Sequence, residues 1–205
     1  MENINTQERM DNSNQPQPGD ALVIVDVQND FLPGGSLAVP HGDEVVPVLN
    51  RYIQAFQALN LPVYATRDWH PAGHCSFREQ GGPWPPHCVA NTAGAGFAAA
   101  LQLPPGTVVI SKAVTVDADA YSGFQGTELD SDLFAAEIKR LFIGGLATDY
   151  CVLNTVRDAR GLGYQVFLLG DAIRAVNVQT GDGMRAEDEM LRLGARKISV
   201  ESVVA

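Results

Sequence analysis

A cysteine follows a glycine-containing turn at the end of an apolar run. Leu141-Phe142-Ile143 leads into Gly144-Gly145-Leu146-Ala147-Thr148-Asp149-Tyr150-Cys151, a pattern typical of a buried strand, a tight turn and the start of a helix. A thiol in the first turn of a helix lies in the partial positive charge of the helix N-terminus, which predicts a lowered pKa for Cys151. Backbone N–H groups at that turn can also bind an oxyanion. The local sequence alone fits a nucleophile and a small buried core residue equally well.

Two charged residues stand where other candidate strands end. Asp26 follows the apolar run 21–25, and Lys112 follows a second run at 108–110. Continuous apolar runs are typical of parallel strands covered on both faces, and ligands collect at the carboxyl ends of such strands. We therefore expect Asp26, Lys112 and Cys151 to converge as a base, a cation and a nucleophile. A structural ion pair is the alternative for Asp26 and Lys112.

A second group of candidate residues follows the strand expected at 61–66. Asp68 and His70 are two positions apart, so in an extended chain their side chains point the same way. His87 follows a stiff Trp-Pro-Pro segment that would hold its imidazole in place. One carboxylate and two imidazoles suit a divalent transition metal, with further positions left for water or substrate. From the residues alone, an exposed loop explains this group at least as well.

Apolar runs alternate with helical patterns along the chain, and this alternation predicts the strands and helices that carry these residues. Such alternation is typical of βαβ units and a parallel sheet, and 205 residues suit one such domain. Strands are expected at 21–26, 61–66, 107–112, 140–145, 165–170 and 197–200. Helices are expected at 43–59, 128–138, 149–160 and 182–193, with Gly161 and Gly194 as C-terminal stops.

Two segments break this alternation. Residues 1–19 are polar and rich in Asn and Gln, which predicts a disordered tail before a single domain at 20–205. Residues 68–106 contain three of the four histidines and both tryptophans. A loop of ~40 residues in a compact domain is usually functional, so this insertion is expected to bind the metal and the substrate.

Charge and cysteine content exclude several classes of partner. The net charge of −10 argues against nucleic acid and anionic membrane surfaces, which both need cationic patches. No apolar stretch approaches the ~20 residues of a membrane-spanning helix. Three cysteines, an odd number, in a chain without a secretory signal predict reduced thiols and a cytoplasmic location.

Six motifs, in order along the chain, resemble those of the nicotinamidase (pyrazinamidase) family of the isochorismatase-like cysteine hydrolase superfamily. The resemblance spans about residues 21 to 200 and implies a three-layer α/β/α fold with a central, mostly parallel six-stranded sheet. The matching motifs are Asp26-Val27-Gln28-Asn29-Asp30-Phe31, Asp68-Trp69-His70-Pro71, Trp84-Pro85-Pro86-His87-Cys88-Val89, Ser111-Lys112, Tyr121-Ser122-Gly123-Phe124 and Gly145-Leu146-Ala147-Thr148-Asp149-Tyr150-Cys151.

The resemblance also assigns roles to individual residues. The catalytic triad of the superfamily matches Asp26, Lys112 and Cys151, and its oxyanion hole matches the backbone N–H groups of Ala147 and Cys151. A non-proline cis peptide bond of the family matches Leu146–Ala147. The substrate pocket of the family matches Phe31, Trp84, Tyr121, Leu146 and Tyr150, although some relatives have histidine where this chain has Tyr150.

For the metal, the resemblance favours a site over an exposed loop. Asp68, His70 and His87 match family ligands of one divalent ion, usually zinc and in some members iron or manganese. Some members carry an additional histidine nearby, which makes His74 a candidate fourth contact. Cys75 and Cys88 match no ligand and are expected to be packing residues, whereas His41 is expected on the surface.

The implied activity is hydrolysis of nicotinamide to nicotinate and ammonia, and of pyrazinamide to pyrazinoate, through a Cys151 thioester. Such an enzyme would act on a small-molecule substrate in NAD salvage and pyridine nucleotide biosynthesis. The sequence does not decide between a monomer and a homo-oligomer. One alternative is a related amidohydrolase acting on a carbamoyl or ureido substrate. Another is a non-catalytic domain that binds nicotinamide, against which the complete triad argues.

Overall fold

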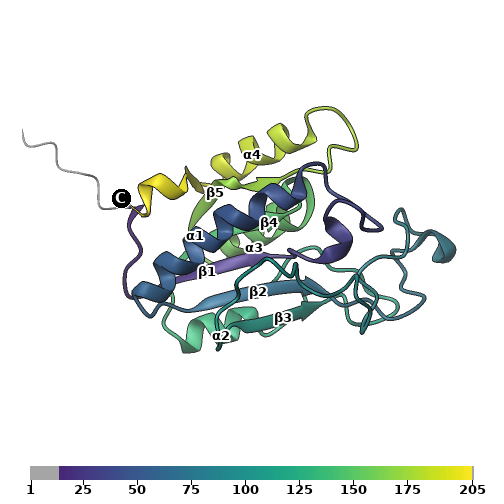
Figure 1. The fold of residues 1–205 in the computed structure, drawn as a ribbon, viewed down its shortest axis with the longest axis horizontal. Helices are drawn as coiled ribbons and strands as arrows, with labels where there is room; N and C mark the ends of the chain where they lie inside the picture. The colour runs from purple at the N-terminus through teal and green to yellow at the C-terminus, as the bar shows by residue number, and fades with distance from the viewer. Residues whose placement is uncertain (1–13, 205) are drawn as a thin grey trace, which may run out of the picture.

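Six parallel strands form the centre of the molecule (Figure 1). The computed structural model describes residues 14–204. In spatial order the strands are β3 (Val108–Lys112), β2 (Val63–Asp68), β1 (Asp20–Val25), β4 (Arg140–Leu146), β5 (Gln165–Arg174) and β6 (Arg196–Ile198). Each neighbouring pair is parallel. The predicted six-stranded sheet is therefore confirmed, and in the described part of the chain it is parallel throughout.

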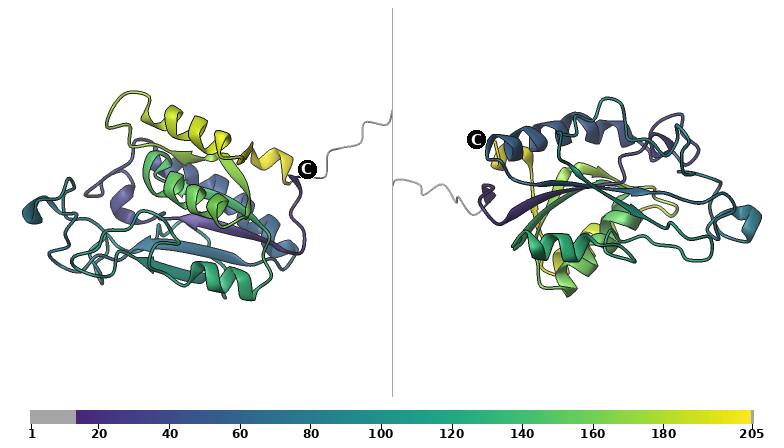
Figure 2. Two further views of the ribbon diagram at one scale, coloured as in Figure 1. Left: turned by 180° about the vertical axis from the view of Figure 1, so that it is seen from behind. Right: turned by 90° about the horizontal axis from the view of Figure 1, so that it is seen from below.

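Helices cover both faces of this sheet, which confirms the three layers (Figure 2). Alternate residues of β1 point to opposite faces, as the period of a strand requires. Leu22 and Ile24 pack with α1, whereas Val23 and Val25 pack with the three other helices. The helices are α1 (Val45–Ala58) on one face, and α2 (Leu129–Ala135), α3 (Leu153–Gly161) and α4 (Asp182–Arg192) on the other.

Element boundaries differ from the prediction mainly at their ends. β5 continues to Arg174 rather than stopping at residue 170, and the helix expected at 149–160 is divided in two. Its first part is the π-helical turn η5 (Thr148–Val152), and its second part is α3. Gly194 follows α4 with a φ of 92°, as predicted for a stop. After α3 the left-handed residue is Gly163, with a φ of 95°, rather than Gly161.

The predicted tail at 1–19 falls partly outside the described residues, which begin at 14. The carbonyl of Gln15 accepts a hydrogen bond from Arg140 (2.9 Å), and its side chain donates to the carbonyl of Ser202 (3.0 Å). The backbone N–H of Gln17 donates to Asp20 (2.8 Å). Ordered contacts with the domain therefore begin before residue 20.

Long loops extend from the carboxyl ends of the strands, on the right of Figure 1. Residues 69–107 connect β2 to β3 and contain one short 3₁₀ turn, η4 (Arg78–Gln80), together with isolated β-bridges. Two further 3₁₀ turns, η2 (Asn29–Phe31) and η3 (Gly42–Glu44), lie between β1 and α1, and a third, η6 (Val200–Ser202), follows β6. Within residues 14–204, no helix is long and apolar enough to cross a membrane.

Candidate active site

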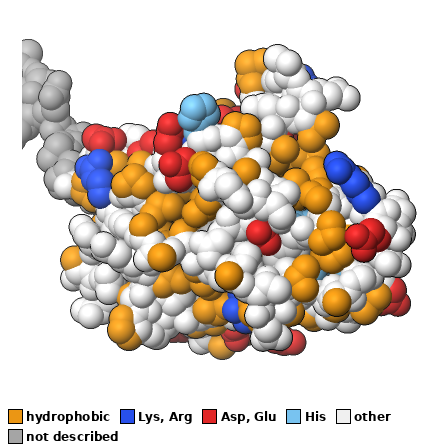
Figure 3. All heavy atoms as spheres, turned by 45° about the vertical axis from the view of Figure 1, so that its right-hand side comes forward, with side chains coloured by type: hydrophobic (Ala, Val, Ile, Leu, Met, Phe, Trp, Pro, Cys, Tyr) orange, Lys and Arg blue, Asp and Glu red, His pale blue; other side chains and the backbone are white. Residues whose placement is uncertain are grey.

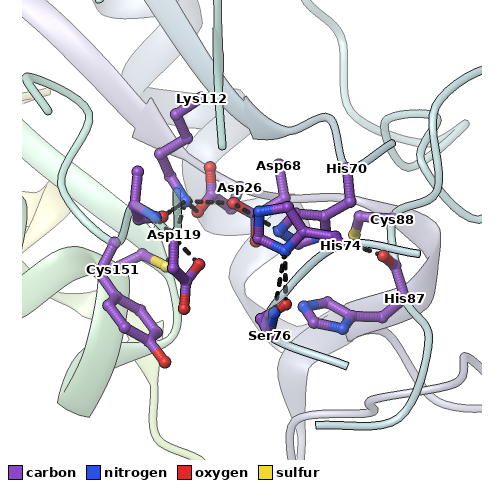
Figure 4. A network of polar contacts seen from close by, with 12 residues as sticks. Asp26, Asp68, His70, His74, Ser76, His87, Cys88, Lys112, Asp119 and Cys151 are labelled. Carbon is purple, nitrogen blue, oxygen red and sulfur yellow. Dashed lines mark hydrogen bonds and ion pairs between the residues drawn. The ribbon is translucent and has the colours of Figure 1, made fainter. Parts of the chain in front are cut away.

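The three residues of the predicted triad meet at the carboxyl end of the sheet (Figure 4). Asp26 follows β1, Lys112 ends β3, and Cys151 lies in η5 after β4. The Nζ of Lys112 is 3.0 Å from Oδ2 of Asp26 and 3.4 Å from Sγ of Cys151. A carboxylate oxygen of Asp26 and the sulfur of Cys151 lie within 4.8 Å of each other. All three side chains are buried, so their charges interact through protein rather than through water.

Neighbouring strands hold the carboxylate and the ammonium in place. Asp26 has a left-handed backbone (φ 49°), and its N–H donates to the carbonyl of Thr66 on β2 (3.2 Å). The Thr66 hydroxyl donates to Oδ1 of Asp26 (2.6 Å). Lys112 lies beside Asp68 in the β2–β3 register, and its ammonium contacts that carboxylate and the carbonyl of Ala120. The cation is therefore shared between two carboxylates.

Burial changes the acid–base properties of the triad. It raises the pKa of the Cys151 thiol, and the positive charge of Lys112 offsets only part of this effect. The predicted lowering of this pKa by the helix N-terminus is therefore wrong, because desolvation of a buried thiolate outweighs a partial charge. Burial raises the pKa of Asp26 as well, although Lys112 lowers it. Burial alone would lower the pKa of Lys112, but Asp26 and Asp68 raise it well above its ordinary value.

These directions indicate how the thiol can react. A thiol with a raised pKa does not ionise unaided, so its proton must pass to a neighbouring base as the sulfur attacks. A carboxylate with a raised pKa is a stronger base than an ordinary one. Asp26, whose Oδ2 lies 3.0 Å from the ammonium that also contacts Cys151, fits that role.

A constrained turn carries the cysteine. Gly145 has a φ of 126°, and a Cβ there would lie 2.1 Å from the carbonyl oxygen of Val25, so only glycine fits. The Leu146–Ala147 peptide bond is cis, as the family resemblance implies. The carbonyl of Ala147 accepts the N–H groups of Tyr150 and Val152 (3.1 Å each), which fixes the start of η5.

Asp68 contacts Lys112 and also lies close to the two other predicted metal ligands. One ligand atom from each of Asp68, His70 and His87 lies within 4.8 Å of the others, and all three residues are buried. Nδ1 of His70 donates to the carbonyl of His87 (2.9 Å), and Nδ1 of His87 donates to the carbonyl of Pro85 (2.8 Å). Both rings therefore present Nε2 with its lone pair, as metal-binding histidines do. Burial lowers the pKa of His70 to about 3, which keeps it neutral. This donor set fits a divalent cation.

His74 is placed differently. Its Nδ1 accepts a hydrogen bond from the backbone N–H of Ser76 (3.3 Å) and lies 2.8 Å from the Ser76 hydroxyl. Nε2 therefore carries the proton and donates to the carbonyl of Ala118 (3.2 Å). His70, His74 and Asp119 also come within 4.8 Å of one another, but both His74 nitrogens are already used. The ring of His74 instead lies against that of His70, tilted by 32° and with centroids 4.4 Å apart. This arrangement does not support His74 as a fourth ligand.

The remaining histidine and cysteines contribute no ligand to the candidate site. His41 is exposed and pairs with Glu44 (3.2 Å). Cys88 is buried and its pKa is strongly raised by burial, and Cys75 is half-buried. All three cysteines are free thiols.

A small cavity borders both the triad and the candidate metal ligands. Its lining is mostly apolar and aromatic, which suits a flat ring. Figure 3 shows the molecule turned toward the loop side, with hydrophobic side chains prominent and charged ones scattered. Residues that line the cavity include Cys151, Asp68, His87, Ala147 and four aromatic side chains, Phe31, Trp84, Tyr121 and Tyr150.

Three of the aromatic residues that line the cavity, Trp84, Tyr121 and Tyr150, contact one another. The indole N–H of Trp84 donates to the hydroxyl of Tyr121 (3.0 Å). The ring of Tyr150 meets Trp84 edge-on, at a centroid distance of 5.1 Å, and lies 5.7 Å from that of Tyr121. Three segments that are distant in sequence are thereby joined over the thiol.

One predicted pocket residue lies elsewhere, and several lining residues escaped prediction. The side chain of Leu146 is fully buried in the core on the α1 face and does not line the cavity, because strand alternation directs it away. Leu37, Val39 and Val176 do line it. They lie in irregular loops, where no periodic pattern marks a residue as inward-facing.

Two polar residues of the Asp26–Phe31 motif hold the backbone next to the candidate metal ligands through hydrogen bonds. The Gln28 side chain donates to the carbonyl of Asp68 and accepts its N–H (2.8 Å each), so it grips the backbone of a candidate metal ligand. Asp30 accepts the N–H of Cys88 (2.7 Å), next to His87. The position of Gln28 and Asp30 inside a family motif indicated a role at the site, but the sequence did not indicate which segments they contact.

Comparison with known proteins extends over nearly the whole chain. Residues 20–201 match the family described as Isochorismatase domain. The nicotinamidase of Escherichia coli (strain K12) is 43% identical over 199 residues, which cover 87% of this chain and 93% of that protein. A pyrazinamidase of Pyrococcus horikoshii, solved in complex with zinc, is 48% identical with a TM-score of 0.85, covering 89% of this chain and 99% of the other.

A third protein, PnC1 from L. infantum in complex with nicotinate, is 38% identical with a TM-score of 0.86. The match covers 93% of this chain and 98% of that one. In all three cases the two proteins therefore correspond over almost their full lengths.

Proposed function

The chain belongs to the isochorismatase family, and from this premise and the geometry of its site we propose that it hydrolyses nicotinamide to nicotinate and ammonia. Pyrazinamide is converted to pyrazinoate by the same chemistry. The observation that carries the proposal is the arrangement at one small cavity: a buried thiol with a base and a cation lies next to three candidate metal ligands. A flat heteroaromatic amide spans that space and meets both groups.

Cys151 is the nucleophile in this account. Asp26 takes the thiol proton at Oδ2 while the sulfur attacks the carboxamide carbon. Asp26 then returns the proton to the nitrogen of the leaving group, the C–N bond breaks and ammonia departs, which leaves a thioester on Cys151. Asp26 next removes a proton from water, whose oxygen attacks the thioester. The C–S bond then breaks, Asp26 returns this proton to the Cys151 sulfur, and nicotinate is released. Lys112 stabilises the negative charge that moves between carboxylate and sulfur.

The turn after β4 provides for the oxyanion. The backbone N–H groups of Ala147 and Cys151 stabilise the negative oxygen that forms during each attack. Both residues line the cavity, and η5 keeps them at a fixed separation. Loss of one such donor costs ~10²–10³ in rate in other enzymes.

Asp68, His70 and His87 hold one divalent cation, which we take to be zinc, with iron or manganese as alternatives. When bound, the cation supplies an electron-pair acceptor for a ring nitrogen. The chain itself orients its ligands through the carbonyls of His87 and Pro85 and through Gln28. The aromatic side chains at the mouth pack against the ring and exclude water from the thiol.

The three free cysteines fit the reducing cytoplasm predicted from the sequence. Of the alternatives, a carbamoyl or ureido substrate is disfavoured by the aromatic cavity walls. A binding domain without catalysis would have no use for three buried ionisable groups in mutual contact, which are expensive to bury.

Substrate comparison tests this proposal. Ammonia release should be measured from nicotinamide, pyrazinamide, benzamide and an N-carbamoyl amino acid, with metal-loaded protein. Benzamide has the same face and the same amide but no ring nitrogen, so its kcat/KM should be lower by roughly 10²-fold or more, at 1.4 kcal/mol per decade. Benzamide turned over as well as nicotinamide would show that the metal does not bind the ring. Preference for the carbamoyl compound would overturn the substrate assignment.

A further inference from the structure

Thr66 contacts the proposed base at two points. It lies on β2, two residues before Asp68, and is completely buried like Asp26. Its carbonyl accepts the backbone N–H of Asp26 (3.2 Å), and its hydroxyl donates to Oδ1 of the same residue (2.6 Å). Thr66 does not line the cavity, so it has no contact with a substrate there.

The two carboxylate oxygens of Asp26 are therefore unequal. Oδ1 accepts the hydroxyl of Thr66, whereas Oδ2 is buried and faces the ammonium of Lys112, 3.0 Å away. That ammonium also contacts Asp68, the sulfur of Cys151 and the carbonyl of Ala120. It has three protons to share among these groups. The hydroxyl of Thr66 is therefore the donor at Oδ1, and the charged partner lies at Oδ2.

We propose that Thr66 is a positioning residue that selects Oδ2 of Asp26 as the atom that takes the thiol proton. By occupying Oδ1, the hydroxyl fixes the rotation of the carboxylate, so that Oδ2 keeps a lone pair for the thiol beside the ammonium of Lys112. In the proposed reaction the S–H bond breaks as the O–H bond forms at Oδ2. Oδ1 then becomes the carbonyl oxygen of a carboxylic acid and still accepts from Thr66. The same proton later leaves Oδ2 for the departing nitrogen. This inference rests on the proposed function.

The test removes the hydroxyl and keeps the shape. Thr66→Val should lower kcat and kcat/KM together, by roughly 10- to 100-fold for a hydrogen bond to a charged group, with KM within about twofold of the parent. Thr66→Ser keeps the hydroxyl and should stay within about threefold of the parent. If Thr66→Val does not fold, Thr66→Ala has no added steric demand and carries the same expectation.

Thr155 offers a matched control. It is also a completely buried threonine, and its hydroxyl oxygen accepts the N–H of Gly123 (3.0 Å), a residue whose position also borders Thr66. Thr155→Val should therefore lose a comparable buried hydrogen bond with little change in kcat. Ammonia release from nicotinamide is measured for all variants, after circular dichroism has shown that each is folded.

Three results would overturn the inference. Thr66→Val with the kcat of the parent would show that the hydroxyl does not position the base. Thr66→Ser as slow as Thr66→Val would make the methyl group responsible. A raised KM with unchanged kcat would place the effect in binding. If the parent protein itself released no ammonia, the proposed function would fail, and this inference with it.

Discussion

Among the individual residues that the structure describes, a single buried cation, Lys112, determines the electrostatics of the site. Lys112 lies between Asp26 and Asp68 and is also 3.4 Å from Cys151, so one cation serves two carboxylates and a thiol. Burial pushes the thiol toward its neutral form, and the cation opposes this. The reactivity of Cys151 is therefore set by a balance between desolvation and one nearby positive charge.

This balance can be tested by removing the charge. Lys112 lowers the pKa of Cys151, so Lys112→Met should raise it further and shift the pH at which iodoacetamide alkylates Cys151 upward, by about one pH unit or more. Lys197→Met removes a surface lysine that pairs with Glu187 and should leave the profile in place. Alkylation should be followed by mass spectrometry of the Cys151 peptide, with a thermal melt of each variant. An unchanged profile would leave Lys112 with a structural role alone.

At the scale of elements, the turn between β4 and η5 has the least tolerance for change. At Gly145 the chain of β4 passes so close to β1 that a methyl group would lie 2.1 Å from the carbonyl of Val25. Any substitution there must push β4 away from β1, and Cys151 and Ala147 would move with it. The close approach of the two strands thus fixes the distance between nucleophile and base.

Replacing this glycine should therefore affect stability and activity together. Gly145→Ala should destabilise the fold by about 2 kcal/mol or more, through overpacking and a strained φ, and abolish most ammonia release. Gly161→Ala is the matched control: it ends α3 with open space at its Cβ, so it should be neutral or slightly stabilising. Thermal melts give the comparison. A Gly145→Ala variant with the melting temperature and activity of the parent would refute the close-contact account.

The β2–β3 connection is the second decisive element, because it supplies His70 and His87 next to Asp68. Elemental analysis of the purified protein should find about one divalent ion per chain. Asp68→Asn, His70→Ala and His87→Ala should each lose it, since the number of ligands sets the affinity. His41→Ala changes an exposed histidine and should retain the metal. Metal-free protein with full activity would contradict the site.

At the scale of the whole molecule, topology explains why so much could be predicted. Asp26, Lys112 and Cys151 are distant in sequence, but each lies at or after the carboxyl end of a strand of one parallel sheet, and parallel strands end at the same edge. Apolar runs therefore predicted both the sheet and the meeting point of the triad. Six motifs in order then indicated the family, which the comparisons confirm.

The features of the site that were not predicted depend on contacts between distant segments, which local sequence patterns do not indicate. Leu37, Val39 and Val176 reach the cavity from irregular loops, and Leu146 was wrongly expected there. The pKa of Cys151 was predicted in the wrong direction, because a helix start is visible in sequence but complete burial is not. The contact between Thr66 and Asp26 likewise requires the register of β1 and β2.

In the proposed mechanism Cys151 performs the hydrolysis, and ammonia release from nicotinamide by three cysteine variants measures this role. Cys151→Ala should lose turnover entirely, because no other described group is placed to form the thioester. Cys75→Ala and Cys88→Ala should keep most of it, since neither sulfur lines the cavity. Each variant is compared at equal metal content. Substantial ammonia release by Cys151→Ala would contradict the thioester mechanism and the assignment of the whole site.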